Sequence, residues 1–323
     1  MRKTARNIDP ATLTPIIGGT PGQSRGLRGG KHCPMDSILP STPAGGRKKN
    51  SSQPPTRLSF HRLQAIDENL DQLSRRVLRF LLRFTVSTTS QLTCLFYMDR
   101  ISQHARELAC WRMLHRLHDH GLIACLPRRV GGLTGGSTPS LWYLTNAGTK
   151  LAQQNSKPEK QSMRIRKNEP PATSILNHKL MVVETYVQLN QLKQDERLDV
   201  LDFQPEPACW RQYLTYTGGL NTLKPDAWAH TIAHNAKYEW YWFLEIDMST
   251  ENLATINRKA DVYEAYRRTG SEQQHSSVFP KVIWIVPDQT REHQLNQLFD
   301  NNHFAAGHQA LTLDEYAALT AKS

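Results

Sequence analysis

The ten residues YEWYWFLEID, which run from Tyr238 to Asp247, predict a β-strand that is apolar on both faces and ends in two carboxylates. Side chains alternate along a strand, so Glu245 and Asp247 point to one face, whereas Trp242 and Leu244 point to the other. A strand that is buried on both faces is typical of the centre of a sheet covered by helices. The stretch therefore predicts a central strand of an α/β sheet, and it raises the question of what the two carboxylates do.

The segments around this strand predict an α/β domain over residues 173–323. Helical and strand patterns indicate helices at 174–191 and 250–268, strands at 200–204, 226–233, 238–247 and 281–286, and a final helical region. The strand before 238–247 reads as its hairpin partner, with the turn at Asn235-Ala236, and this register places Asp226 directly opposite Glu245. The Cβ atoms of such a pair are about 4.5–5.5 Å apart, and like charges at that separation repel.

Three arrangements relieve this repulsion: solvent exposure at the strand end, a shared proton with a raised pKa, or a bound cation. A divalent cation also accounts for the convergence of acids from adjacent strands, so we expect a Mg²⁺ ion held by Glu184, Asp226, Glu245 and Asp247. Glu184 enters this set because it flanks the buried stripe of the helix at 174–191. Solvent exposure stays open as the structural alternative.

The charge of the chain is divided unevenly along its length. The net charge of +11 is made up of +8 in residues 1–60, +6 in 61–155, +3 in 156–172 and −6 in 173–323. A basic front half joined to an acidic second half indicates a region that binds polyanions next to a domain of another kind. We expect a disordered basic tail at 1–60, a DNA-binding domain at 61–154 and an exposed linker at 155–172.

Residues 61–154 predict three helices followed by a β-hairpin, which is the order of a winged helix-turn-helix domain. The expected helices begin near Gln72, Ser90 and Ser102, and the hairpin strands are expected at 122–126 and 141–144. The inner side of the third helix is expected to comprise Ala105, Leu108, Trp111, Leu114 and Leu117.

In a winged helix the third helix enters the major groove, and the hairpin tip lies on the phosphate backbone. The side chains expected to contact DNA are Gln103, His104, Arg106, Arg112, Arg116, Arg128 and Arg129. Arginine can pair with guanine in a bidentate manner and glutamine with adenine, so this chemistry suits base readout. The alternative is that the domain pairs with a protein.

Pro225-Asp226, followed by Glu245-Ile246-Asp247 at the end of an apolar strand, resembles the core of PD-(D/E)XK nucleases. In that superfamily the Asp and the Glu bind magnesium, and a Lys two positions after the Glu orients the attacking water. Asp247 occupies the position of that Lys here, and Lys259 on the following helix is the candidate to replace it. The resemblance implies a restriction-endonuclease-like mixed sheet with catalytic residues Asp226, Glu245 and Lys259. An ordinary surface role for Lys259 stays open.

A longer series of segments resembles the replication-relaxation family of plasmids and integrative conjugative elements over roughly residues 70–300. The segments include LSRRVLRFLLRFTVSTTSQL, LNHKLMVVE, LKPDAWA and FLEIDMSTENLATINRKADVYEAY. The resemblance implies a role in plasmid replication, DNA relaxation or mobilisation. Carried over by position, its candidate site comprises Glu184, Asp226, Glu245, Asp247, Thr250 and Lys259.

Two functions remain open from the sequence. One is a DNA-processing protein, a Mg²⁺-dependent endonuclease or nickase that acts at a plasmid origin. The other is a winged-helix repressor or accessory factor whose nuclease-like domain is catalytically silent and serves for dimerisation. We expect double-stranded DNA of a plasmid or conjugative-element origin as the partner, and we also consider a relaxase or replication protein and a second copy of the chain. The chain has no apolar run of 18 residues or more, so we expect a cytoplasmic protein without membrane contact.

Overall fold

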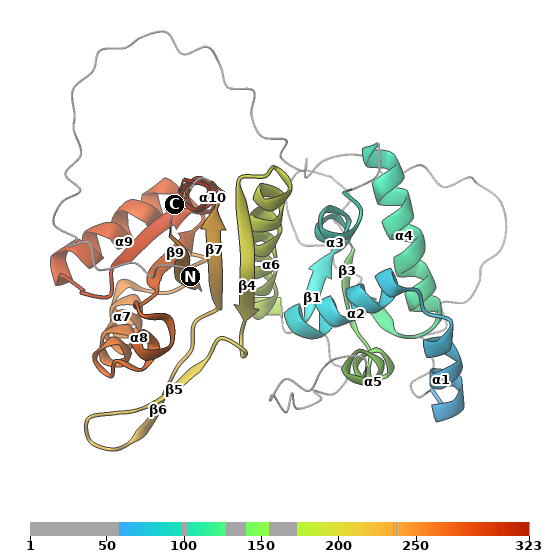
Figure 1. Cartoon of the computed structure of the whole chain (residues 1–323), viewed down its shortest axis with the longest axis horizontal. Coiled ribbons are helices and arrows are strands. Elements are labelled where there is room, and N and C mark those ends of the chain that lie inside the picture. Colours follow the sequence, from blue (N-terminus) through green and yellow to red (C-terminus); the bar gives the residue numbers. More distant parts are fainter. Residues whose placement is uncertain are drawn as a thin grey trace, which may run out of the picture.

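The computed structural model describes residues 58–98, 102–126, 140–154, 173–234, 236 and 238–322. Its elements form an N-terminal group, α1 to α5, and a C-terminal group around a larger sheet, and helix α6 (Thr173–Gln194) lies between the two groups (Figure 1). The fold is mixed α+β, as the sequence predicts. The predicted linker at 155–172 lies outside the described residues, as does the predicted basic tail up to residue 57.

The N-terminal group combines helices with a three-stranded antiparallel sheet of order β1-β3-β2. Its elements are α1 (Phe60–Glu68), α2 (Gln72–Phe84), β1 (Val86–Thr88), α3 (Thr89–Phe96), α4 (Gln103–Asp119), β2 (Ile123–Leu126), β3 (Leu141–Leu144) and α5 (Asn146–Gln154). The three predicted helices correspond to α2, α3 and α4, and the predicted hairpin strands correspond to β2 and β3. The sequence analysis missed α1, α5 and the short strand β1.

Capping residues explain where α2, α3 and α4 begin. Asp71 accepts a hydrogen bond from the backbone N–H of Ser74 at 2.6 Å and caps α2. Thr88 and Gln91 form a reciprocal capping box at the start of α3. Ser102 caps α4, so this helix begins one residue later than predicted.

The buried side of α4 agrees with the predicted one at Leu114 and Leu117 but differs from it elsewhere. Its buried residues are Cys110, Met113, Leu114 and Leu117, whereas Trp111 is 46% exposed and Ala105 is also exposed. The Trp111 ring packs on His115 instead, with ring centroids 4.1 Å apart. Apolar residues lie on two flanks of this helix, and their spacing alone did not determine which flank faces the core.

The C-terminal group is built on a five-stranded sheet of order β10-β9-β8-β7-β4, in which β4, β7 and β8 are antiparallel neighbours and β8, β9 and β10 are parallel. Its strands are β4 (Leu198–Pro205), β7 (Ala227–Ala233), β8 (Trp240–Ile246), β9 (Lys281–Val286) and β10 (His308–Thr312). Its helices are α7 (Leu253–Arg268), α8 (Ser271–Ser276), α9 (Gln289–Asn302) and α10 (Leu313–Thr320). A separate hairpin of β5 (Arg211–Leu214) and β6 (Leu220–Leu223) leaves the chain between β4 and β7. This hairpin, β10 and α8 were not predicted.

Strand β8 is the central strand of the sheet and is covered on both faces, as its sequence predicts. Trp242 and Leu244 belong to the buried cluster that includes residues of α6 and α10. Phe243 belongs to a second cluster, which includes residues of α7 and α9. Glu245 and Asp247 have their partners on the side of α7 and α9.

The predicted register of the β7–β8 hairpin is confirmed. Ala227 lies opposite Leu244, and Trp228 lies opposite Phe243. Beyond the last ladder pair, the backbone N–H of Asp226 donates to the carbonyl of Leu244 at 3.0 Å. Asp226 is therefore held beside the end of β8.

One cluster of buried apolar residues runs through both groups of elements by way of α6. The ring of Tyr186 on α6 lies 5.0 Å from that of Phe84 at the end of α2 and 5.0 Å from that of Phe203 on β4. Gln91 at the start of α3 donates a hydrogen bond to the carboxylate of Glu184 on α6 at 2.8 Å. The N-terminal helices are thus packed directly against the first helix of the C-terminal group.

Candidate functional site

The candidate site lies at one end of the sheet, where β7 begins and β8 ends. Asp226 precedes β7, and its Oδ2 accepts a hydrogen bond from the backbone N–H of Ile246 at 2.7 Å. Glu245 is the penultimate residue of β8 and is only 4% exposed. The structure thus brings together the two carboxylates that the sequence places opposite each other.

Glu245 is held by two side chains of α7. The hydroxyl of Tyr263 donates to Glu245 Oε1 at 2.6 Å, and Lys259 Nζ lies 3.7 Å from Glu245 Oε2. Lys259 also forms an ion pair with Glu251 at 3.0 Å. The inward reach proposed for Lys259 from the sequence is present, although 40% of its side chain remains exposed.

Burial is the main cause that raises the pKa of Glu245 to about 8, and the negative charge of Asp226 raises it further. The positive charge of Lys259 and the hydrogen bond from Tyr263 act in the opposite direction. Burial and the neighbouring Glu245 hold the pKa of Tyr263 well above its usual range, so its hydroxyl stays a proton donor to Glu245. Relief of the repulsion between the two carboxylates therefore includes a proton on Glu245 near neutral pH.

Asp226 is paired with His178, a residue of α6 that the sequence analysis did not assign to the site. His178 Nε2 lies 2.9 Å from Asp226 Oδ2. Burial lowers the pKa of His178, but its hydrogen bond to Asp226 and the charges of Asp226 and Glu206 outweigh this effect, so the pKa lies above its ordinary value. His178 lies six residues before Glu184 on α6, about 240° around the helix, because 3.6 residues complete one turn.

A further ion pair lies at the same edge. Lys179, the residue after His178, contacts Glu206 Oε1 at 3.0 Å, and the backbone N–H of Glu206 donates to the carbonyl of Asp226 at 2.9 Å. At this end of the sheet Glu206, Asp226 and Glu245 are thus paired with Lys179, His178 and Lys259, respectively. Sequence reasoning missed Glu206 and Lys179 because no motif connects the start of α6 to the end of β4.

Asp247 does not join Glu245 in an open site. Its Oδ2 accepts a hydrogen bond from Arg291 Nε of α9 at 2.6 Å, and its Oδ1 accepts one from the backbone N–H of Ser249 at 2.8 Å. Asp247 is 4% exposed and the side chain of Arg291 only 10% exposed. Because both strand-end carboxylates are buried, the solvent-exposure alternative is wrong. The predicted metal role of Asp247 is also unsupported, since a buried arginine already neutralises it.

Glu184 lies away from the end of the sheet that carries Glu206, Asp226 and Glu245, which we call the acidic edge. Its carboxylate accepts the hydrogen bond from Gln91 of α3, and so it faces the N-terminal group and not Asp226. The structure thus corrects the expectation that Glu184 belongs to the site. Thr250, which the family resemblance added, is an exposed residue of the loop before α7.

The predicted four-carboxylate magnesium site is not assembled. Within the described ranges, no group of three or more His, Cys, Asp or Glu side chains is arranged to hold a metal ion. Asp226 and Glu245 remain as a pair of acids. Magnesium is commonly bound by one or two carboxylates together with waters and substrate phosphates. The pair therefore fits such an ion only when a phosphate-bearing ligand completes the shell and Glu245 has lost its proton.

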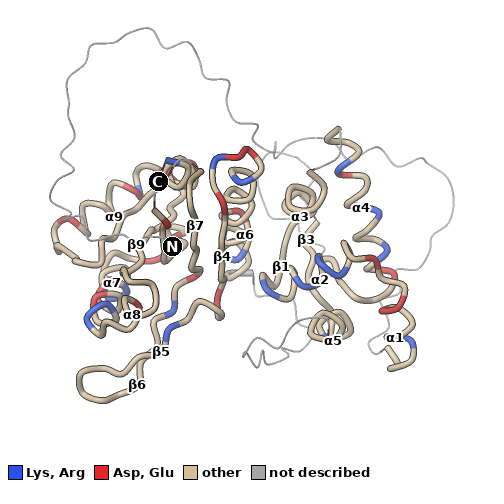
Figure 2. The backbone as a smooth tube through the Cα atoms, viewed as in Figure 1, with Lys and Arg blue, Asp and Glu red and all other residues tan. Residues whose placement is uncertain are grey.

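The predicted DNA-contacting residues of α4 differ in their solvent exposure and in their side-chain partners. Gln103, His104 and Arg112 are exposed, and Figure 2 shows Lys or Arg positions in blue along the backbone of this helix. Arg116 instead contacts Asp71 and donates to Ser74 Oγ at 3.0 Å, so it ties α4 to the start of α2.

The remaining predicted DNA contacts are Arg106, Arg128 and Arg129. The Nη1 of Arg106 lies 3.5 Å from the sulfur of Met98, and the residue is half-buried. Arg128 and Arg129 lie outside the described residues. Among the predicted DNA contacts on α4, Gln103, His104 and Arg112 thus lie on the exposed surface of the helix, together with Arg116, which is also paired.

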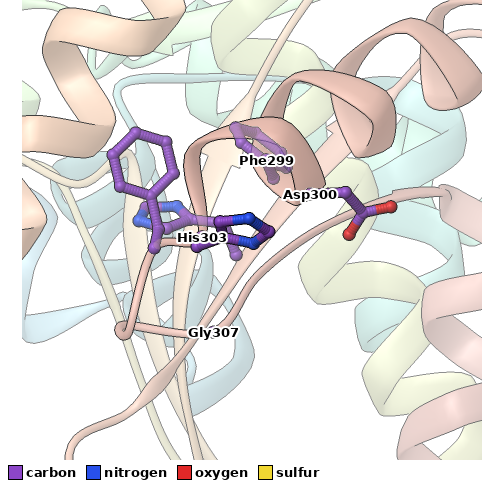
Figure 3. A pocket seen from close by; sticks show the side chains of 6 residues that line it. Phe299, Asp300, His303 and Gly307 are labelled. Atoms are coloured by element: carbon purple, nitrogen blue, oxygen red, sulfur yellow. The ribbon is translucent and has the colours of Figure 1, made fainter.

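A pocket of about 300 Å³ lies elsewhere, between the end of α9 and the start of β10 (Figure 3). It is lined by Phe299, Asp300, His303, Phe304, Gly307 and His308. Burial lowers the pKa of His308 to about 3, and its Nδ1 accepts a hydrogen bond from Trp284 Nε1 at 3.0 Å. None of the acids at the end of β8 lines this pocket, so it is separate from the candidate site.

The family model described as replication-relaxation matches residues 78–282, which include α3, α4 and every residue of the Asp226–Glu245–Lys259 group. The chain belongs to the replication-relaxation family. This membership gives the replication-relaxation protein a role in the replication or relaxation of plasmids or other mobile elements. No curated protein and no solved structure matches the chain significantly. No helix in the described part of the protein has both the length and the apolar character required to cross a bilayer.

Proposed function

We propose that the chain binds duplex DNA of a plasmid or conjugative element and that the acidic end of its sheet cleaves or holds a DNA strand with the help of a magnesium ion. The observation that carries this proposal is the position of Lys259, whose Nζ lies 3.7 Å from Glu245 Oε2 while Asp226 flanks the same strand end. Two acids can hold a magnesium ion together with a substrate phosphate, and a nearby lysine adds a positive charge at the same end of the sheet.

DNA binding is supported by the order of elements and by charge. Helices α2, α3 and α4 followed by the β2–β3 hairpin have the order of a winged helix, in which α4 enters the major groove. Gln103, His104 and Arg112 are exposed on α4, where they can contact base edges and phosphates. The net charge of +11 gives the protein an electrostatic attraction to a polyanion.

Asp226 and Glu245 are the residues that would hold the magnesium ion, which when bound stabilises negative charge on the reacting phosphate. Lys259 lowers the pKa of Glu245 and thereby favours the ionised carboxylate that a metal requires. The cation of Lys259 also offers a partner for a phosphate oxygen, since 40% of its side chain is exposed. His178 fixes the orientation of Asp226 from the opposite helix.

The test is conversion of supercoiled plasmid to open circle by the full chain in magnesium, compared with Asp226→Asn. We expect the variant to lose nicking at least a hundred-fold while its affinity for duplex DNA in EDTA stays unchanged. Asp261→Asn, on an exposed position of α7, is the matched control and should nick as the wild type does. Nicking that survives Asp226→Asn would exclude this site as the source of cleavage.

A second candidate is a DNA-binding regulator or accessory factor whose sheet is catalytically silent. The observation that favours it is Asp247, which replaces the expected lysine and is neutralised by Arg291. This candidate predicts a DNase footprint on element DNA that is indifferent to EDTA, together with no nicking by the wild type in magnesium or manganese. Metal-dependent nicking that Asp226→Asn abolishes would rule it out.

A further inference from the structure

The β5–β6 hairpin leaves the sheet at the acidic edge. Its connections begin after Glu206 and end before Asp226, two residues whose backbones are joined by the 2.9 Å hydrogen bond described above. In Figure 1 the hairpin projects away from the five-stranded sheet and from both groups of helices. Whatever contacts the root of the hairpin therefore also lies close to the candidate site.

The root of the hairpin is anchored in the core. Tyr213 and Leu223 are buried in the cluster that contains Phe243 and Tyr263 of the sheet and α7. Arg211 adds an ion pair with the buried Glu272 of α8 at 3.1 Å. The two strands are thus fixed relative to the acidic edge.

The tip of the hairpin is apolar, exposed and internally organised. Tyr216 is fully exposed, and the cross-strand pair Leu214 and Leu220 is 65% and 70% exposed. The backbone N–H of Thr215 donates to the carbonyl of Gly219 at 2.7 Å, and Thr215 Oγ1 accepts from the N–H of Gly219 at 3.0 Å. Large apolar side chains are rarely this exposed in clusters unless they contact a partner.

Charge is confined to the root. Residues 212–223 contain no Lys, Arg, Asp or Glu, and Figure 2 shows positive positions at the root of the hairpin but not along its tip. Lys224 places its Nζ 4.9 Å from the ring of Trp210, which is 38% exposed. Exposed aromatic rings combined with cations are the features with which proteins bind bases and phosphates of a DNA strand.

We propose that the β5–β6 hairpin is a DNA-contacting arm whose Tyr216 stacks on an unpaired or unstacked base of the strand that the acidic edge holds. This inference rests on the proposed DNA-processing function and adds a base contact to it. Lys224 attracts the phosphates at the root, and Leu214 and Leu220 flank the base at the tip. Strand β5, from Arg211 to Leu214, extends roughly 10 Å, which spans about three nucleotides at 3.4 Å each, and Tyr216 lies in the turn beyond it.

DNA fits this arm better than a second copy of the chain does. A self-association surface is commonly a broad apolar patch, whereas the exposed apolar side chains here are confined to the tip of one narrow hairpin. The root also carries Lys224 beside the exposed ring of Trp210, and a cation next to an aromatic ring suits a polyanionic partner with bases. Wedges of one or a few apolar side chains are a common way to unstack base steps.

The experiment measures binding of the full chain to a fluorescein-labelled forked DNA, a duplex with a single-stranded tail, by anisotropy in EDTA. We expect Tyr216→Ser to weaken binding about ten-fold, the order that one stacked base contributes. Tyr216→Trp keeps an aromatic face and should bind within two-fold of the wild type. Tyr238→Ser removes another exposed tyrosine, at the other end of β8, and should leave binding unchanged.

A second readout locates the contact directly. Forked DNA that carries 5-iodo-2′-deoxyuridine in its tail is irradiated with the wild-type chain, and the cross-linked peptide is sequenced by mass spectrometry. We expect the cross-link at Tyr216. A wild-type affinity in Tyr216→Ser together with a cross-link elsewhere would overturn the arm but leave the proposed DNA function standing.

Two other outcomes separate the arm from the function on which it rests. If the wild type binds neither the fork nor a plain duplex at low salt, the DNA-processing proposal fails, and the arm fails with it. If sedimentation equilibrium shows a dimer that Tyr216→Ser converts to a monomer, the tip is a self-association element and the arm proposal is wrong.

Discussion

Glu245 and Asp247 are two residues apart on one face of one strand, yet the structure stabilises them differently. Asp247 is paired with a buried arginine, with Arg291 Nε 2.6 Å from its Oδ2. Glu245 has only a half-exposed lysine at 3.7 Å and a tyrosine hydroxyl, and its pKa is raised to about 8. Asp247 thus has a buried partner of opposite charge, whereas Glu245 lacks one and is a carboxyl group that can exchange its proton near neutral pH.

Asp247 and Glu245 therefore have different roles. Arg291 also donates from Nη2 to the carbonyl of Glu251 at 2.7 Å, so Asp247 and Arg291 together fasten α9 to the loop before α7. That loop leads into the helix that carries Lys259 and Tyr263, the two partners of Glu245. The Asp247–Arg291 pair thus positions the side chains of Lys259 and Tyr263 around Glu245.

The largest expected effect comes from removal of the arginine. Arg291→Met leaves Asp247 buried with an unpaired charge, and we expect the free energy of unfolding to fall by about 3–5 kcal/mol. Urea denaturation followed by tryptophan fluorescence measures this loss. The double variant Arg291→Met with Asp247→Leu should recover most of it, because no buried charge remains. A loss below about 1 kcal/mol in the single variant would show that Asp247 is not committed to this pair.

The second effect concerns Glu245 and depends on pH. The pKa of Glu245 in the folded protein is about 8, above the ordinary 4.5. The contribution of protonated Glu245 to the free energy of unfolding is therefore fully present below pH 4.5 and is lost as the pH rises through 8. The wild type should therefore lose stability between pH 5 and pH 8, by up to about 1.4 kcal/mol for each pH unit. Glu245→Gln, which cannot ionise, should be less dependent on pH over this range. Urea midpoints at pH 5, 6, 7 and 8 give the comparison, and equal slopes in both proteins would contradict the raised pKa.

The positions of Asp226, Glu245 and Lys259 could be predicted from the sequence, whereas their partners from distant helices could not. Alternation along YEWYWFLEID and the turn before it determined the faces of β8 and placed Asp226 opposite Glu245, because strand periodicity is local. The reach of Lys259 followed from its position on the helix after the strand. The partners His178 and Arg291 come from helices that are distant in sequence, and nothing local distinguishes them from other His and Arg residues.

The same limit explains the incorrect assignment of Glu184 and the failure to predict the hairpin. Glu184 lies on the correct helix, but the structure turns it toward Gln91, because α6 packs on the N-terminal group as well as on the sheet. The β5–β6 hairpin has four-residue strands with exposed leucines, and so its alternation is weak as a sequence signal.

The smallest expected effect on stability, and the sharpest test of the comparison, is Lys259→Met. Because 40% of the lysine side chain is exposed, its loss should change the free energy of unfolding by less than about 1 kcal/mol. Its positive charge nevertheless lowers the pKa of Glu245, so the variant should raise that pKa further. Carbon-13 NMR titration of the glutamate carboxyl groups measures the shift, with Glu245→Gln to assign the signal. Arg258→Met, on an exposed neighbour of the same helix, is the control and should leave the Glu245 titration unchanged. If the pKa of Glu245 does not respond to Lys259→Met, the lysine is an ordinary surface residue. Among the described residues, the proposed site would then have no exposed cation that contacts Glu245.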